Sequence, residues 1–249
     1  MKRIGLFVPC YIDDFYPEAA LSTLEILEAH GFDVAYPENQ SCCGQPLFNN
    51  GLPEDARLLA ERFVKLFGAF DYVVAPSSSC IATVKYRYRE VLPQKEAEAL
   101  GKRVYELFEF LHDVVGVERL RLPHPFPHRV GLHQSCHGLR ELGLGCPSET
   151  FVKGCGDKVR RVLEKVEGID VVMPSRDECC GFGGTFSVQE HALSARMGRD
   201  RIADHTANGV EVITGVDMSC LMHMQGLAKR DGIPLRFVHA AQILAGRAE

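Results

Sequence analysis

The sequence lacks any run of about 20 consecutive apolar residues, which is the length that a membrane-spanning helix requires. It also lacks an excess of basic residues, because 28 Lys and Arg stand against 33 Asp and Glu and leave a net charge of -5. Such a chain has no general attraction for nucleic acid. The apolar run in its first residues, MKRIGLFVPC, is only about five residues long, which is too short for the core of a signal peptide. We therefore expect a cytoplasmic protein with no membrane span and no nucleic-acid partner.

Two kinds of sequence motif are also missing. The chain contains no G-x-G-x-x-G fingerprint of a dinucleotide site and no recognisable flavin motif. It contains no C-x(2–4)-C pair, which is the usual chelate of a structural zinc site. It does contain 10 cysteines. In the reducing cytoplasm these are better explained as metal ligands or redox groups than as structural disulfides, which are the alternative.

Eight of the ten cysteines follow an internal repeat. The segment RIGLFVPCYIDD, residues 3 to 14, aligns with RVGLHQSCHGLR, residues 129 to 140, and the match continues through a Cys-Cys-Gly and a further cysteine in each half. The aligned positions are Cys10 with Cys136, Cys42-Cys43-Gly44 with Cys179-Cys180-Gly181, and Cys80 with Cys220. Two duplicated domains are therefore predicted, 1–120 and 121–249, joined near the proline-rich segment LRLPHPFPHR.

Short apolar runs alternate with helical patterns within each half. The predicted strands cover residues 4–8, 33–37 and 72–76 in the first half, and 130–133, 171–174, 212–216 and 235–238 in the second. Alternating strands and helices predict an α/β fold with parallel sheets and right-handed crossovers. We therefore expect each domain to be a small, Rossmann-like parallel sheet flanked by helices.

The repeated cysteines follow predicted strands. Because the carboxyl ends of parallel strands share one edge of a sheet, where ligands bind, the four thiols of each half are expected to meet. The first set is Cys10, Cys42, Cys43 and Cys80, and the second is Cys136, Cys179, Cys180 and Cys220. Gly44 and Gly181 then provide either positive φ and a close approach to a bulky inorganic group, or simply a turn.

Four thiolates suit an iron–sulfur cluster or a zinc ion. A nucleophilic cysteine beside His133, His137 or His223 is a third interpretation, but it does not explain eight thiols in two matched sets. His133 and His137 either compensate for the charge of a cluster or are structural. Phe182 and Phe186 either shield the second site or pack in the core. Cys146 and Cys155 lie outside the repeat and are predicted to be buried free cysteines.

Several segments together resemble a known family: LFVPC, CCGQP, the SCH segment, CCGFGGTFSV and GVDMSCLMH. They are similar to the cysteine-rich Cys-Cys-Gly domain proteins, which include the B subunit of heterodisulfide reductase and the iron–sulfur subunit of glycolate oxidase. The similarity is greatest to the lactate utilization protein A family. The resemblance implies two [4Fe-4S] clusters on the eight repeated cysteines. It also implies an oxidoreductase component that transfers electrons, with two further subunits, in the oxidation of L-lactate or a related 2-hydroxy acid to pyruvate.

One departure from the family pattern concerns the cluster type. In heterodisulfide reductase the third cysteine segment reads C-x-x-C, whereas here its first position is Ser77 in one half and Asp217 in the other. Four cysteines per half predict an ordinary [4Fe-4S] cluster instead of a noncubane one. Asp217 is either an additional oxygen ligand or a helix N-cap. The alternative functions are a heterodisulfide or thiol–disulfide reductase-type subunit and a zinc-stabilised scaffold without a redox role.

Overall fold

A computed structural model describes residues 2–149 and 156–248 of the chain. Its eight described strands form two four-stranded sheets, both entirely parallel, with strand orders β2-β1-β3-β4 and β6-β5-β7-β8. The strands are β1 (Arg3–Leu6), β2 (Asp33–Ala35), β3 (Tyr72–Ala75), β4 (Val104–Glu106), β5 (Arg129–His133), β6 (Asp170–Val172), β7 (Val212–Gly215) and β8 (Arg236–His239). The α/β fold with two duplicated parallel sheets, predicted from the repeat, is confirmed.

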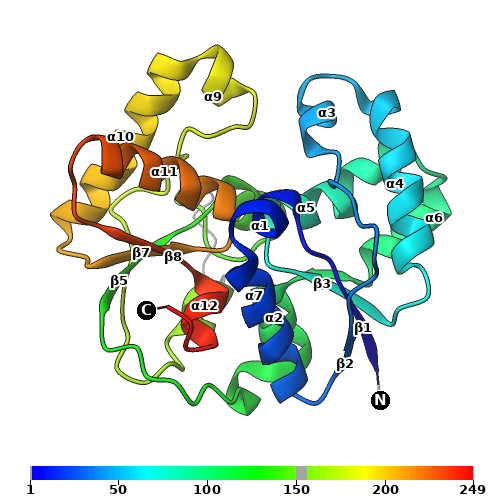
Figure 1. Ribbon diagram of the computed structural model, residues 1–249, viewed down its shortest axis with the longest axis horizontal. Coiled ribbons are helices and arrows are strands. Elements are labelled where there is room, and N and C mark those ends of the chain that lie inside the picture. Colours follow the sequence, from blue (N-terminus) through cyan, green and yellow to red (C-terminus); the bar gives the residue numbers. More distant parts are fainter. Residues whose placement is uncertain (1, 150–155, 249) are drawn as a thin grey trace.

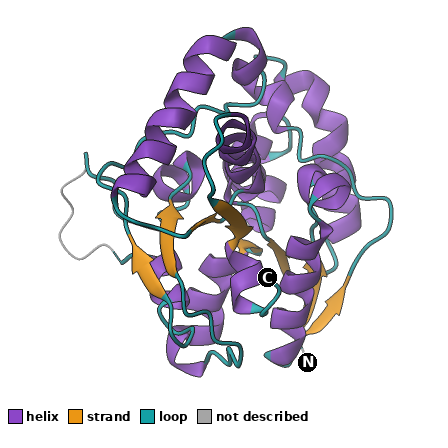
Figure 2. Ribbon diagram, turned by 60° about the vertical axis from the view of Figure 1, so that its left-hand side comes forward, coloured by secondary structure: helices purple, strands orange, loops and turns teal. Residues whose placement is uncertain are grey.

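Helices flank the two sheets (Figures 1 and 2). The first half contains α1 (Cys10–Phe15), α2 (Pro17–Ala29), α3 (Gln45–Asn49), α4 (Pro53–Phe67), α5 (Ser78–Ala82), α6 (Gln94–Gly101) and α7 (Leu107–Phe110). The second half contains α8 (Lys158–Leu163), α9 (Phe186–Gln189), α10 (His191–Ala207), α11 (Met218–Arg230) and α12 (Ala240–Leu244). Short 3-10 and π-helical turns extend α5 and α7, and a π-helical turn, His137–Glu141, follows β5. No helix in the described part of the chain is long and apolar enough to cross a membrane.

The two sheets are built alike, strand for strand. In the first, Ile4 of β1 pairs with Val34 of β2 and Tyr72 of β3. In the second, Val130 of β5 pairs in the same way with strands β6 and β7. The first strand of each half is therefore central, and the carboxyl ends of three neighbouring strands lie together at one edge. This edge is where the repeated cysteines follow the strands.

The fourth strand of the first sheet, β4, is absent from the sequence prediction. It has only three residues, and the following helix α7 continues its apolar pattern. A capping box marks the boundary: Glu106 accepts hydrogen bonds from the backbone N–H groups of Phe108 and Glu109. His239 has the same position at the end of β8, where it caps α12 together with Gln242. The sequence signal was therefore present, as E-x-x-E in one half and H-x-x-Q in the other.

Helices of each half pack against helices of the other half. Helix α12, near the end of the second half, packs against α2 of the first, and α7 of the first half packs against α8 of the second. In Figure 1 the red α12 lies next to the blue α2. Arg247 strengthens this contact with ion pairs to Glu18 and Glu25. Each sheet lies on its own side of the predicted boundary between residues 120 and 121, but the apolar core is continuous across it.

Candidate metal centre between the two halves

The first cysteine set forms a string of neighbouring thiols. Cys10 begins α1, Cys42 and Cys43 precede α3, and Cys80 lies in the first turn of α5. Hydrogen bonds from the thiols of Cys10 and Cys43 lower the pKa of Cys42 to about 3. The pKa values of Cys10 and Cys43 are raised in return, in Cys43 by its contacts with Cys42 and Cys80. The order of contacts along the string is therefore Cys10, Cys42, Cys43 and Cys80.

The second set repeats this arrangement. Hydrogen bonds from Cys136 and Cys180 lower the pKa of the Cys179 thiol to about 2. The contacts of Cys180 with Cys179 and with Cys220 raise its own pKa, as does its burial. Each half therefore holds one thiolate at neutral pH between thiols that remain protonated in the absence of metal. All eight repeated cysteines are free thiols.

The glycine after each cysteine pair is required by the backbone. Gly44 has φ +85° and Gly181 has φ +88°, so the expectation of positive φ is confirmed. The N–H of Gly44 donates to Sγ of Cys42 at 3.4 Å, and that of Gly181 donates to Sγ of Cys179 at 3.3 Å. In the second half a further N–H, of Phe182, donates to Sγ of Cys180 at 3.5 Å. The turns therefore direct amide donors at the sulfur atoms.

Gly181→Ala is expected to destabilise the protein clearly more than Gly184→Ala. Both positions have positive φ, which costs a non-glycine residue about 1–2 kcal/mol. A Cβ on Gly181 would also lie 2.5 Å from the carbonyl oxygen of Ser194, whereas one on Gly184 would meet no atom of the described residues within 4 Å. The clash adds about 1–3 kcal/mol. Urea unfolding of both variants measures the difference, and equal losses would contradict the tight packing described here.

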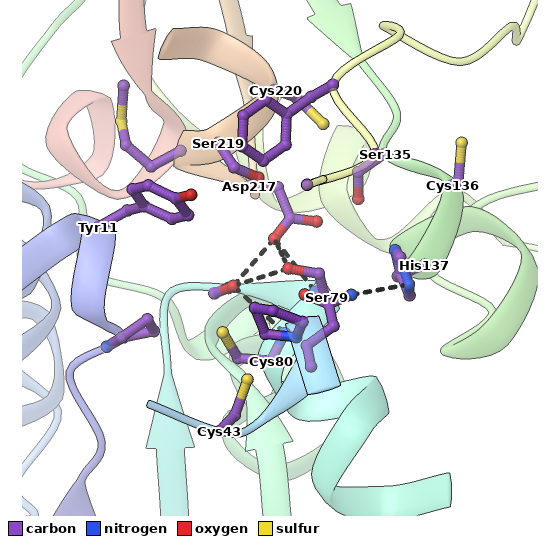
Figure 3. Close-up of a pocket in the computed structure, with 18 of the residues that line it drawn as sticks. Tyr11, Cys43, Ser79, Cys80, Ser135, Cys136, His137, Asp217, Ser219 and Cys220 are labelled. Atoms are coloured by element: carbon purple, nitrogen blue, oxygen red, sulfur yellow. Dashed lines mark hydrogen bonds between the residues drawn. The ribbon is translucent and has the colours of Figure 1, made fainter. Parts of the chain in front are cut away.

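All eight repeated thiols line one open cavity between the two halves. Its volume is about 950 Å³, part of which is open to solvent. Figure 3 shows Cys43 and Cys80 on one side, Cys136 and Cys220 on the other, and Asp217 with Ser79 between them. Gln45 and His137 join the two sides through a hydrogen bond of 3.0 Å. The two sets therefore face each other across a shared space.

The polar group between the two sets is centred on Asp217, whose side chain is buried at 2% exposure. Its carboxylate accepts four hydrogen bonds: from the hydroxyls of Ser77 at 2.9 Å and Ser79 at 2.8 Å, from the backbone N–H of Ser79 at 3.1 Å, and from the hydroxyl of Ser78. Ser78 also contacts Ser135 through their hydroxyls, at 2.6 Å. Of these serines the sequence analysis singled out Ser77 alone, as the counterpart of Asp217, although PSSSC contains three of them.

The prediction that the side chain of Asp217 caps its own helix is wrong. Asp217 does occupy the N-cap position of α11, but its side chain makes no cap hydrogen bond there. It accepts the N–H of Ser79 in α5 of the other half instead. Ser77, its counterpart, does cap its own helix by accepting from the N–H of Cys80. The reason is that the first turns of α5 and α11 meet at the interface between the halves, where N–H groups and hydroxyls are cut off from water.

The remaining predicted residues lie in different places. Phe182 lines the cavity and packs its ring edge against Tyr11, with ring centroids 5.8 Å apart. Phe186 is half-buried in α9 and is not part of the cavity lining. His137 lines the cavity, whereas His223 contacts Ser194 beside it. The prediction that Cys146 is a buried free cysteine is wrong, because it is exposed and takes part in a disulfide bond. Cys155 lies outside the described residues.

A buried polar group lies behind the second cysteine set. It consists of His133, His205 and Arg201, and the rings of the two histidines are 6.4 Å apart. Burial lowers the pKa of His133 to about 4 and that of His205 to about 3, with a further contribution from Arg201 in each case. Arg201 forms a buried ion pair with Asp204 at 2.8 Å. Both histidines are therefore neutral in the folded protein at pH 7.

His205→Phe is expected to make the protein less sensitive to acid. Between pH 6.5 and about 3 the unfolded chain binds a proton at His205 that the folded chain does not, so stability is lost as the pH falls. Removing this group should reduce the slope of unfolding free energy against pH by about 1.4 kcal/mol per pH unit. Urea unfolding of metal-free, reduced protein between pH 4 and 6.5 measures it. An unchanged slope would show that His205 titrates normally.

The duplicated sheets and the two facing thiol sets define a cysteine-rich protein of the Cys-Cys-Gly class. The family model described as "CCG: Cysteine-rich domain" matches residues 4–85 and 130–225, one match in each half. The chain is 36% identical to "Lactate utilization protein A" of Halalkalibacterium halodurans, over 97% of this chain and 96% of that protein. It is 38% identical to "Lactate utilization protein A" of Shouchella clausii, over 97% and 98%. The chain belongs to the lactate utilization protein A family.

Solved structures offer a weaker likeness. A glutamate racemase from Bacillus anthracis is 11% identical, with a TM-score of 0.39, over 98% of this chain and 79% of that one. A likeness at this level carries no functional argument. The function of the chain is therefore inferred from its sequence relatives and from the geometry of the cavity.

Proposed function

We propose that the chain holds two [4Fe-4S] clusters, one on each cysteine set, and transfers electrons in the oxidation of L-lactate, or a related 2-hydroxy acid, to pyruvate. It acts as one subunit of a cytoplasmic complex with two further proteins. The name of the curated relatives, "Lactate utilization protein A", supports the substrate class. The observation that carries the proposal is the presence of two matched strings of four thiols at one cavity.

The spacing of the thiols favours a cluster over a single zinc ion. Tetrahedral zinc with Zn–S bonds of about 2.3 Å requires sulfur atoms about 3.8 Å apart. Among the described residues, one group of three potential metal ligands has all its ligand atoms within 4.8 Å of one another, and it consists of His133, Cys180 and Cys220. No set of four thiols in the described residues is as compact as that. The more open spacing of each string fits a larger inorganic group.

The thiols and amides of the chain are suited to hold such a group. Cys42 and Cys179 are thiolates before any metal binds, because neighbouring thiols donate hydrogen bonds to them. The thiols with raised pKa values must release a proton on binding, so uptake is expected to be faster at higher pH; they are Cys10, Cys43, Cys136 and Cys180. The N–H groups of Gly44, Gly181 and Phe182 donate to the sulfur atoms. Such hydrogen bonds help set a reduction potential.

The chain alone does not supply every group that the oxidation of lactate needs. When bound, an iron–sulfur cluster accepts and releases electrons one at a time. Oxidation of a 2-hydroxy acid releases two electrons and two protons, and the sequence has no dinucleotide fingerprint that would identify a hydride acceptor. A partner subunit therefore supplies the group that reacts with lactate. Tyr11 and Phe182 pack edge to face at one side of the cavity, and the open side gives access to the partner.

The test is lactate-dependent reduction of the assembled complex. The chain is isolated without oxygen together with the proteins that copurify with it, and L-lactate is added while the visible absorbance is followed. We expect lactate to bleach the absorbance and pyruvate to appear in proportion. Absorbance that responds to a chemical reductant, but to no 2-hydroxy acid in the presence of the partners, would contradict the proposed substrate class.

A further inference from the structure

The surroundings of the two cysteine sets differ at three matched positions. Behind the first set, Phe7 packs on Phe63 and Phe67 of α4, with ring centroids 5.0 Å and 5.8 Å apart. Three residues before Cys136, where the repeat has Phe7 before Cys10, the second half has His133. Helix α10 likewise has Arg201 and His205, four residues apart as Phe63 and Phe67 are. An apolar cluster in one half is thus replaced by a polar one in the other.

The close approach at two matched glycines confirms that these positions correspond. A Cβ on Gly5 of β1 would lie 2.8 Å from the ring of Phe67. A Cβ on Gly131 of β5 would meet Nδ1 of His205. Each helix therefore presents the same position to the same strand, and the change from phenylalanine to histidine and arginine is a real difference between two equivalent environments.

His133 is placed to contact the second cysteine set. Its side chain is 3% exposed, and its Nε2 atom has no hydrogen-bond partner among the residues that the structure describes. One of its ring nitrogens lies within 4.8 Å of the sulfur atoms of both Cys180 and Cys220. A buried polar atom without a partner costs about 1–3 kcal/mol. A metal centre held by these two cysteines would remove that cost.

We propose that His133 supplies an imidazole nitrogen to the metal centre of the second cysteine set, beside the thiolates of Cys180 and Cys220. The inference rests on the proposed binding of a metal centre by that set. Mixed thiolate and imidazole ligation is common for zinc and occurs in iron–sulfur centres, where histidine raises the reduction potential. Phe7 offers no ligand atom to the first set. The two centres therefore differ in ligand set.

The test uses ¹¹³Cd²⁺ as the probe, loaded anaerobically into the reduced, metal-free full chain labelled with ¹⁵N-histidine. We expect two cadmium resonances, one for each cysteine set, with a nitrogen coupling on one of them alone. In His133→Phe, which introduces the residue that the first half already has, the coupling should vanish and the cadmium affinity of that centre should fall about tenfold or more. The other resonance should be unchanged.

His205→Phe is the matched control, because it changes the same buried group without touching the cysteines. It should keep the nitrogen coupling. The proposal is overturned if the wild-type protein shows no coupling or no second resonance, or if the coupling persists in His133→Phe and so belongs to another histidine such as His137. Since cadmium loading needs neither iron nor sulfide, a chain that shows the coupling but forms no iron–sulfur cluster would disprove the proposed function and leave this inference standing.

Discussion

Cys180→Ser should remove the metal centre of the second half and leave that of the first half in place. Serine has nearly the same shape as cysteine, but its hydroxyl stays protonated at neutral pH and is a poor ligand for iron. Cys180 is buried between Cys179 and Cys220, so its loss interrupts the string in the middle. Iron content is expected to fall from about eight to about four atoms per chain. Iron and acid-labile sulfide analysis of anaerobic protein measures it.

Cys43→Ser is the reciprocal variant, at the equivalent position of the first string. It should produce the same loss of iron, but the spectrum that remains should be that of the other centre. If the second centre receives electrons from the partner, only Cys180→Ser abolishes reduction by lactate, whereas Cys43→Ser stops electron transfer after that step. Variants that keep about eight iron atoms would contradict ligation by these cysteines. Identical residual spectra would contradict two distinct centres.

Asp217→Ala should cost about 3–5 kcal/mol of unfolding free energy, because it leaves several buried donors without an acceptor. Four hydrogen bonds from Ser77, Ser78 and Ser79 end on this carboxylate, and they join the first turns of α5 and α11. Chemical unfolding of metal-free protein measures the loss. The iron content of the folded variant should be retained if Asp217 acts only through the serines. Loss of iron with unchanged stability would support the alternative that Asp217 is a ligand.

Two variants calibrate this effect. Ser77→Ala removes one donor to Asp217 and also the acceptor that caps α5 at the N–H of Cys80, so it should cost about 1–2 kcal/mol. Asp217→Asn keeps the shape and one acceptor oxygen, so its cost should lie between the other two. If Asp217→Ala and Ser77→Ala destabilise the protein equally, the carboxylate does not join the two halves in the way described.

The fold and the thiols of the site were predictable from the sequence because both depend on the order of elements within one half. Strands of parallel sheets end at a common edge, so a cysteine after each strand implies convergence without knowledge of any distance. Strand β4 was missed because three residues give too short a pattern, although Glu106 and Glu109 form a capping box. The repeat itself continues from VYELFEFLHDVVG, residues 104 to 116, to FVHAAQILAG, residues 237 to 246, and so aligns Val104 and Tyr105 with the end of a predicted strand of the second half.

The contacts between the halves were not predictable in this way. Whether Asp217 caps its own helix or the opposite one depends on how the two sheets are placed relative to each other, and no local pattern encodes that. The replacement of Phe7 by His133 is visible in the alignment of the two halves. That His133 lies in one buried group with Arg201 and His205 is seen only in the structure, where α10 packs on β5 as α4 packs on β1. The relative orientation of the duplicated domains therefore could not be predicted from the sequence alone.

The most direct test of the account is the metal content of the wild-type chain purified without oxygen. Two four-thiol sets predict about eight iron and eight sulfide per chain, with the brown colour and visible absorbance of [4Fe-4S] clusters. Reduction should bleach that absorbance and produce a paramagnetic signal. A colourless protein from a strictly anaerobic preparation, free of iron or holding stoichiometric zinc, would contradict the central claim that this cavity holds two redox centres.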